Sequence, residues 1–446
     1  MKANLLYLLA MVAALFTVSC SNDSDKTLDG VPGSYSGRNL TITVNGSVYS
    51  DANAKVDVSG SDADNMTFDI HNVVFGQELY TVGKCQVRVD DFDARIFAGE
   101  SETDCNSVKI QGKISAGKMV LEIQQEGLTG NYSSANGSGI SINGKQAAST
   151  ASVEITGMSS ADVKMYLRNI IVGVEELEIS SVTIVPVDKA TPGTKAEIIV
   201  VRKFTAEYKD SYRDIAISGS VQNGVMNIEI TSKNLGDAIG KWKIAQAEGE
   251  SYPDILLEVE GPADLQIMGM DVSYFVIFVK SIVGQLGAEY LNALQYIDFK
   301  EDGSIALLVH DPANGGAVIE IPNEMIPEGA LGWYMAEGKI VFVVDATMID
   351  MIPGGYGEII KGFFETKGGY IHVPLNYRKE TTGGISIYLD KDFLAAALPV
   401  IEANLPDEIL NDPTFGEMIQ TILADLKVAL TKCSVFNVGF PLEKVQ

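Results

Sequence analysis

Basic residues are scarce in this 446-residue chain, which has 33 lysines and arginines against 59 aspartates and glutamates and a formal net charge of −26. Nucleic acids and anionic lipid surfaces are bound through basic patches, so this charge disfavours both as partners. Histidine is scarcer still, with only His71, His310 and His372 at distant positions. Without a His-x-x-His pair or closely spaced cysteines, the sequence predicts no zinc site, no other metal and no cofactor.

The motifs of common enzyme classes are also missing. The chain has no Gly-x-Ser-x-Gly, no Walker loop and no strand-linked Gly-x-Gly-x-x-Gly. Aspartates cluster at Asp62-Ala63-Asp64-Asn65 and at Asp90-Asp91-Phe92-Asp93, which is compatible with calcium binding. Neither run has the length and glycine position of an EF-hand loop, so we interpret both as solvated turns. No catalytic residue is predicted, and we expect a protein that is not an enzyme; catalysis that converges without a motif is the less favoured alternative.

Long apolar runs are few, and the first lies at the N-terminus. Lys2 precedes an apolar run over residues 5–16, which is followed by Thr17-Val18-Ser19-Cys20. The run is too short to span a bilayer, and the layout is typical of a secretory signal peptide over residues 1–19. Its final cysteine resembles the lipobox of bacterial lipoproteins, which implies that Cys20 carries a lipid that attaches the chain to a membrane. Ordinary secretion with a coincidental cysteine is the alternative.

Residues 20–30 form a polar and acidic tether that begins with Ser21-Asn22-Asp23-Ser24-Asp25 after the cysteine. It resembles the export signal of Bacteroides-type surface lipoproteins, although a solvated linker without information has the same composition. The resemblance implies an outer-membrane lipoprotein exposed at the cell surface, with a periplasm-facing protein as the alternative.

Three further cysteines follow in the chain. A disulfide between Cys85 and Cys105 is an option in an exported protein and would be worth about 3 kcal/mol. If the flanking segments pair as a simple hairpin, however, the two Cα atoms lie too far apart, and the bond requires residues 99–104 to fold back. Both outcomes stay open from the sequence. We expect Cys433 to be a buried free thiol.

An internal repeat sets the domain organisation. The matching blocks are residues 33–36 with 130–133, 54–60 with 151–157, 66–76 with 163–173, 110–114 with 217–221, and 117–123 with 224–230. The second copy is longer around Thr191-Pro192-Gly193-Thr194, which is a loop composition that tolerates insertion. The sequence therefore predicts two tandem copies of one domain.

Apolar and polar residues alternate through almost every matched block, as in Met66, Phe68 and Ile70. Such alternation places the apolar side chains on one face of a sheet. Turn compositions such as Asn45-Gly46 separate the runs. Several short antiparallel strands within roughly a hundred residues predict a meander that curls into a small barrel, because closure buries the apolar face and removes exposed edges.

Each copy opens with Gly-x-aromatic, as Gly33-Ser34-Tyr35 and Gly130-Asn131-Tyr132, and a third such opening occurs at Gly240-Lys241-Trp242. This pattern resembles the calycin-like, lipocalin-type domains of Bacteroidetes lipoproteins, in which the aromatic residue plugs the closed end of the barrel. The resemblance implies calycin-like barrels over residues 31–128 and 129–238 and a lipocalin-like domain over residues 239–446. The expected fold class is mainly β, with tandem antiparallel meander barrels and a C-terminal α+β domain that carries helical insertions.

The C-terminal region adds helices. We expect them over residues 272–294, 356–364 and 390–403, and after Asp412-Pro413 as far as Leu430. The first contains Lys280 and Gln285, which suit a soluble helix better than a membrane span, and its apolar first half needs cover on every side. Because these helices are private to the third domain, a ligand pocket is most expected there. Its candidate lining is Phe275, Phe278, Trp333, Tyr334 and Phe342, with ordinary core as the alternative.

These observations favour a membrane-anchored lipoprotein whose lipocalin-like domains bind a small apolar molecule or a glycan without catalysis. The alternative is a structural or interaction subunit of a cell-surface assembly, in which the β-domains are spacers that present loops to a partner. The sequence identifies neither a specific ligand nor a protein partner.

Overall fold

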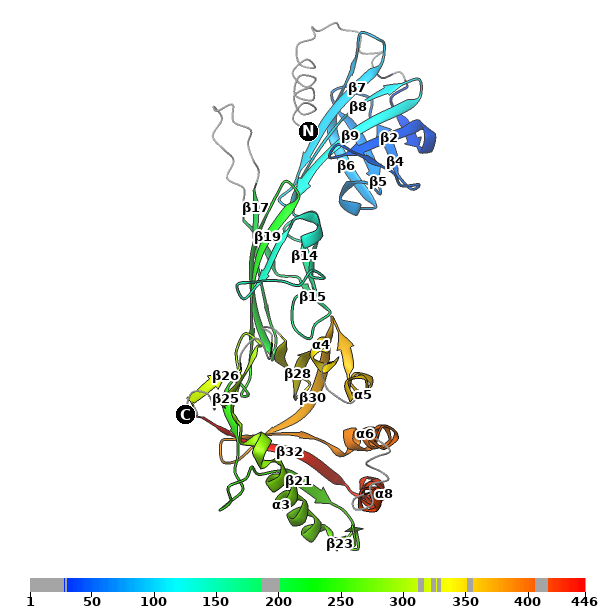
Figure 1. Ribbon diagram of the computed structural model, residues 1–446. Helices are drawn as coiled ribbons and strands as arrows, with labels where there is room; N and C mark the ends of the chain where they lie inside the picture. The colour runs from blue at the N-terminus through cyan, green and yellow to red at the C-terminus, as the bar shows by residue number, and fades with distance from the viewer. Residues whose placement is uncertain are drawn as a thin grey trace.

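The computed structural model describes residues 28, 30–185, 201–311, 317–321, 326, 330–350, 356–405 and 416–445. Cys20 and the predicted signal peptide lie outside this range. The mainly β fold class is confirmed, and the described α-helices all lie between residues 272 and 432. Figure 1 shows three lobes in a row, formed by β1–β9, by β10–β19, and by β20–β32 together with the helices. No described helix combines the length and the hydropathy that a membrane span requires.

The first lobe is a curled sheet of nine strands in the order β1-β4-β5-β6-β7-β8-β9-β2-β3. Its strands are β1 (Gly33–Ser36), β2 (Leu40–Val44), β3 (Ser47–Tyr49), β4 (Lys55–Ser59), β5 (Met66–His71), β6 (Leu79–Val89), β7 (Arg95–Glu102), β8 (Asn106–Ser115) and β9 (Lys118–Gly127). The strands β4 to β9 pair in sequence order, each antiparallel to the next, as the alternation predicts. Their inward side chains, among them Val56, Phe68 and Leu121, form the core of the lobe.

The N-terminal strands close the first lobe. β1 pairs antiparallel with β4, and after a 3-10 turn, η1 (Gly37–Asn39), β2 pairs parallel with β9. One stretch of chain thus joins the first and last strands of the meander. Because an up-and-down ring with an even number of strands closes antiparallel, the parallel contact means that this ring is odd, unlike the eight-stranded lipocalin barrel.

The second lobe repeats this pairing. Its strands are β10 (Gly130–Ser133), β11 (Gly139–Ile142), β12 (Lys145–Gln146), β13 (Ser152–Thr156), β14 (Lys164–Arg168), β15 (Glu176–Ile179), β16 (Val182–Val185), β17 (Arg202–Lys209), β18 (Arg213–Gln222) and β19 (Val225–Asn234). The orders β10-β13-β14-β15 and β12-β11-β19-β18-β17-β16 match the first lobe once β6 is divided into β15 and β16. Tyr35 lies opposite Val56, and the matching Tyr132 lies opposite Val153. The repeated sequence blocks therefore correspond to one pairing pattern that occurs twice.

An asparagine holds the closing strand in both lobes. Asn45 and Asn143 follow β2 and β11 and have left-handed φ values of 49° and 50°. The Asn45 amide donates to the Gln125 carbonyl at 3.1 Å and accepts from the Gln125 N–H at 2.9 Å. Asn143 makes the same two bonds to Ser232, at 3.0 and 2.9 Å. The turn that the sequence predicts therefore also ties the closing strand to the last strand of the meander, and we call this pair of bonds the asparagine latch.

The third lobe is built around a larger curled sheet in the order β26-β25-β24-β20-β32-β31-β30-β28-β27, with β21 beside β32 and β29 beside β30. Its strands are β20 (Gly240–Ile244), β21 (Leu256–Glu260), β22 (Gln266–Ile267), β23 (Met270–Asp271), β24 (Leu294–Phe299), β25 (Ile305–Asp311), β26 (Ala317–Glu320), β27 (Leu331–Ala336), β28 (Lys339–Asp345), β29 (Glu365–Lys367), β30 (Tyr370–Lys379), β31 (Ile385–Leu389) and β32 (Val435–Lys444). The helices are α3 (Val272–Leu291), α4 (Ala346–Asp350), α5 (Tyr356–Phe363), α6 (Lys391–Ala403) and α8 (Gly416–Lys432). Thus α3, α5, α6 and α8 occur where the sequence predicts helices.

The three Gly-x-aromatic openings have one structural role. In each lobe the aromatic side chain donates to the backbone carbonyl four residues earlier, at 2.9 Å for Tyr35, 2.9 Å for Tyr132 and 2.7 Å for Trp242. All three rings are buried. The Tyr35 and Tyr132 hydroxyls also lie 2.9 and 3.3 Å from the carbonyl five residues earlier. Each ring therefore fixes the segment through which the chain enters its lobe, since the acceptors of its buried donor belong to that segment.

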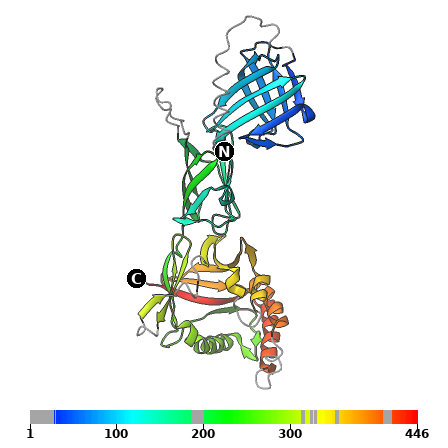
Figure 2. The same cartoon turned by 45° about the horizontal axis from the view of Figure 1, so that its top comes forward.

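Successive lobes are joined by hairpin tips. The turn between β7 and β8 carries Cys105, which is fully buried in the core of the second lobe. At the matching place between β17 and β18, Tyr212 packs against the core of the third lobe. The N–H of Leu128 donates to the Cys105 carbonyl at 3.0 Å, and that of Leu235 donates to the Tyr212 carbonyl at 2.7 Å. One repeated contact thus couples the lobes in series, and Figure 2 shows the same succession from another side.

We predict that Asn143→Gly destabilises the second lobe by about 1–2 kcal/mol. Glycine keeps the left-handed backbone but removes both bonds of the asparagine latch, together with a longer bond of 3.4 Å from the Asn143 amide to the Asp302 carbonyl, so the loss reports these side-chain bonds. Asn223→Gly is the matched control, because Asn223 has a φ of 52° in a turn and its side chain holds no other residue in the described part of the chain. Urea unfolding measures both variants, and equal midpoints would contradict the role of the latch.

Candidate interaction surface

The five aromatic residues predicted to line a pocket are not brought together. Phe275 belongs to a cluster with β22 and α8, whereas Trp333 and Phe342 belong to the core of the curled third sheet. Tyr334 lies in a separate small cluster, and Phe278 is 41 % exposed. Trp333 and Tyr334 are neighbours on a strand and point to opposite faces of the sheet. Phe275 and Phe278 are three residues apart on a helix and differ in direction by about 60°. Residues that are close in the sequence therefore do not share one site here. The predicted pocket is corrected to separate core and surface positions.

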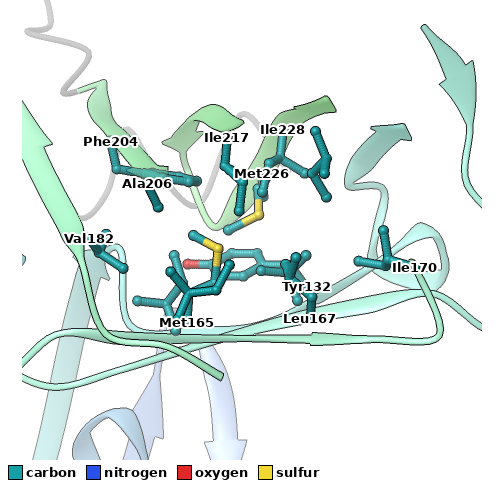
Figure 3. Packing of buried hydrophobic residues seen from close by; sticks show 14 of the residues in the cluster. Tyr132, Met165, Leu167, Ile170, Val182, Phe204, Ala206, Ile217, Met226 and Ile228 are labelled. Carbon is teal, nitrogen blue, oxygen red and sulfur yellow. The ribbon is translucent and has the colours of Figure 1, made fainter. Parts of the chain in front are cut away.

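Side chains fill the interior of the lobes. In the second lobe, Figure 3 shows Tyr132, Met165 and Leu167 on one side of the core, facing Ile217 and Met226 on the other. The first lobe has a buried core at the matching positions. Such filled interiors resemble ordinary protein cores and give a ligand little room.

The core of the third lobe is also aromatic and closely packed. Phe299 contacts Trp333 and Phe342 edge-on, with ring centroids 5.3 and 5.6 Å apart. The indole N–H of Trp333 donates to the Lys300 carbonyl at 2.9 Å. Trp333 is therefore a satisfied core residue, which is the alternative that the sequence left open for it.

Two shallow hollows on the described surface lie outside these cores. One of about 440 Å³ lies on the outer face of the second lobe and is lined by Gly139, Ser141, Gln146, Lys203, Ser218, Gly219, Ser220, Asn227, Ile228 and Glu229. The other, of about 390 Å³, lies beside the end of α3 and is lined by Lys243, Ile244, Gln246, Pro253, Leu291, Asn292, Leu294, Gln295, Tyr296 and Glu443. Neither includes a residue of the predicted pocket.

Cys85 and Cys105 are free thiols in different cores, so the structure does not contain the disulfide that the sequence left open. Cys85 packs over Gly99 in the middle of β7, whereas Cys105 is in the turn beyond the end of that strand. Six residues of strand span roughly 20 Å, and a disulfide requires Cα atoms within about 7 Å. The loop does not fold back, because its tip is held in the second lobe. Cys433 is also a buried free thiol.

The first histidine has a structural partner. His71 Nε2 lies 3.1 Å from Asp57 across β4 and β5, and at the matching place Arg168 lies 2.6 Å from Glu154. A cation–carboxylate pair on the outer face thus recurs with different residues, which indicates a cross-strand contact and not an acid–base site. The aspartates of the two acidic runs serve their own turns: Asp62 accepts from the Asp64 N–H, and Asp90 accepts from the Ala94 N–H. No group of three or more potential ligands gathers for a metal among the described residues.

Tyr334 closes the joint between the second and third lobes. Its hydroxyl lies 3.2 Å from Nδ1 of His372, and the Arg213 guanidinium lies 5.1 Å from the centre of its ring. The ring also rests on Gly173, where a Cβ atom would collide with it. Gly173 and Arg213 belong to the second lobe, so a residue predicted to bind a ligand instead connects two lobes.

One side of α3 is uncovered. Phe275, at 3 % exposed, packs into the lobe, but Tyr274 and Ile277 are each 67 % exposed, and Phe278 and Ile282 are 41 % and 39 % exposed. These last four residues form what we call the α3 face. The sequence predicted a helix that is covered on every side, because its apolar run is unbroken, yet the structure covers one side only. In Figures 1 and 2 α3 lies in the part of the third lobe that is remote from the other two.

The α3 face carries no charge. Residues 272–279 contain no acidic or basic residue. The first charge along the helix, Lys280, is 2.9 Å from Asp254 and is therefore engaged within the lobe. A helix that is apolar on both sides in an acidic chain indicates a second contact beyond its own core. The absence of charge over residues 272–279 was the signal in the sequence for an apolar contact surface. It did not show whether that surface is buried in the lobe or is free to dock a partner.

We predict that all three described cysteines are alkylated when the protein is denatured without a reductant. Burial raises the pKa of Cys85 to about 12, and burial together with Asp162 and Asp104 raises that of Cys105 to about 11, so neither thiol should react in the native state. Mass spectrometry after iodoacetamide treatment counts the labels. If Cys85 and Cys105 stay unlabelled until a reductant is added, they are bonded and the assignment is refuted.

We predict that acidification weakens the joint at Tyr334. Burial lowers the pKa of His372 from 6.5, and the Lys367 charge also lowers it, whereas a hydrogen bond to the Lys367 backbone and the Glu365 charge raise it. Because the unfolded chain binds this proton more readily, the stability is present above about pH 6.5 and falls as the pH drops below that value. Urea unfolding of the wild type and His372→Gln at pH 7.5 and pH 5 measures the difference. The variant should lose less stability on acidification, and an equal loss in both would contradict the prediction.

No family model matches this chain, and no curated protein and no solved structure matches it either.

Proposed function

We propose that this chain is a non-enzymatic, membrane-anchored interaction subunit whose β lobes act as a spacer and whose third lobe docks a protein partner. The single observation that carries the proposal is the α3 face, an uncharged helical surface whose aromatic and aliphatic side chains are up to 67 % exposed. Such a surface costs solubility unless a partner covers it. This is the alternative that the sequence offered beside ligand binding.

The series of lobes supports the spacer role. Hairpin tips embedded in the next core, at Cys105 and Tyr212, resist bending between lobes more than a flexible linker does. A lipid on Cys20 and the tether over residues 20–30 would attach the chain beside the first lobe. The α3 face belongs to the last lobe of the row, so an anchor at Cys20 would leave it accessible away from an outer membrane (Figure 1).

The calycin-like interpretation of the first two lobes is part of this proposal. It is supported by the meander order and by the buried aromatic residues at Tyr35 and Tyr132. The parallel closure between β2 and β9 is a difference from that family of barrels. The filled cores favour scaffolding over the binding of a small apolar molecule inside a barrel, and they leave glycans only the outer surface.

A photo-crosslinking residue at Ile277 tests the proposed function in the cells that produce the chain. We expect a protein adduct from Ile277 and none from the matched position Phe92, which is 86 % exposed on the first lobe. Lipid or sugar adducts alone, or equal protein adducts at both positions, would refute an interaction role for α3.

A further inference from the structure

The acidity of the chain restricts what can meet the α3 face. Two copies with a formal charge of −26 each repel one another over most of their surface. The α3 face is a place where this repulsion is weak, because residues 272–279 are uncharged and Lys280 is paired with Asp254. A partner that docks there is therefore selected by apolar shape and not by opposite charge.

Other occupants fit this face less well. Helices that lie in a bilayer surface carry lysine or arginine beside their apolar side. The only basic residue of α3 is Lys280, and it is paired with Asp254. A small apolar molecule needs a concave site, whereas Tyr274, Ile277 and Phe278 stand on a helix ridge and line neither hollow. A strongly charged partner finds no ion-pairing group.

The same face of a second copy matches in both chemistry and shape. Tyr274, Phe278 and Ile282 are spaced four residues apart and form one ridge of α3. Ridges of this spacing pack into the grooves of an identical helix, at a crossing angle of about −50°. A two-fold axis makes such a contact self-complementary, and it is the commonest symmetry of protein oligomers.

The size of the face sets the strength of such a contact. The exposed fractions of its four side chains correspond to roughly 400 Å² of apolar surface per copy, or about 800 Å² for two copies. Stable specific complexes bury at least about 1,200 Å² in total. The contact is therefore weak in free solution and becomes populated where copies are concentrated on one membrane.

We propose that two copies of this chain associate reversibly through their α3 faces, which deepens the proposed function by naming its partner. The contact is apolar and the rest of the surface is repulsive. Added salt therefore strengthens the association, whereas it would weaken binding that rests on charge attraction.

Sedimentation velocity tests this with the chain beginning at Ser21, which keeps every described residue. We expect the mean sedimentation coefficient to rise with protein concentration up to about 1 mM and to rise further when salt is raised. Ile277→Glu should weaken association at least tenfold, because it places a charge on both faces of the contact. Tyr274→Glu should act in the same way, and Phe92→Glu, at a still more exposed site on the first lobe, should not.

A single monomer at every concentration and salt level, or dimers that are unaffected by both α3 variants, would overturn the proposal. Thermal unfolding verifies that the variants fold, and their exposed positions give no reason for a lower midpoint. If the chain is monomeric but the Ile277 photo-adduct contains a different protein, the second copy is excluded as the partner and the proposed interaction function stands. If neither association nor a protein adduct is found, both fail.

Discussion

The burial of one lobe's hairpin tip in the core of the next is the contact on which the rest of this molecule depends. Cys105 is fully removed from water in a core that otherwise belongs to the second lobe, and Tyr212 occupies the matching place in the third. Apolar burial of this kind is lost if two lobes rotate apart, whereas a bare linker would cost nothing to bend. The order of the lobes and the separation of the two thiols both follow from this repeated joint.

The fold of the first two lobes was largely predictable from the sequence, because each copy acts as a control on the other. Matched blocks with alternating residues had to form matched strands, and Tyr35 and Tyr132 occupy the same register position. The parallel closure was not predicted, because the alternation of apolar and polar residues shows which face of the sheet a side chain occupies and not whether the neighbouring strand runs parallel or antiparallel. The asparagine latch was also missed, since a left-handed turn explains Asn45 without any bond to Gln125.

The candidate site was predicted less well, for reasons that lie in particular residues. Trp333 and Tyr334 are adjacent, yet one fills a core and the other joins two lobes. Composition cannot separate these roles, because both bury an aromatic ring. The apolar run of α3 contains too few polar residues to show which side of the helix is buried. Phe275 and Phe278 were therefore both predicted to line a pocket, whereas the first is buried and the second is exposed. The presence of helices in the third domain alone still directed attention to that lobe.

The entry and exit of each β unit lie at opposite ends. The ring of Tyr35 or Tyr132 fixes the entering segment, and the turn at Cys105 or Tyr212 leaves at the far side. Gene duplication can therefore insert or delete whole units without disturbing the remaining ones, since every unit offers the same hairpin turn to the next lobe and the same core to receive the turn of the preceding one. The length of the row then becomes a heritable quantity that changes in discrete steps, by one unit at a time.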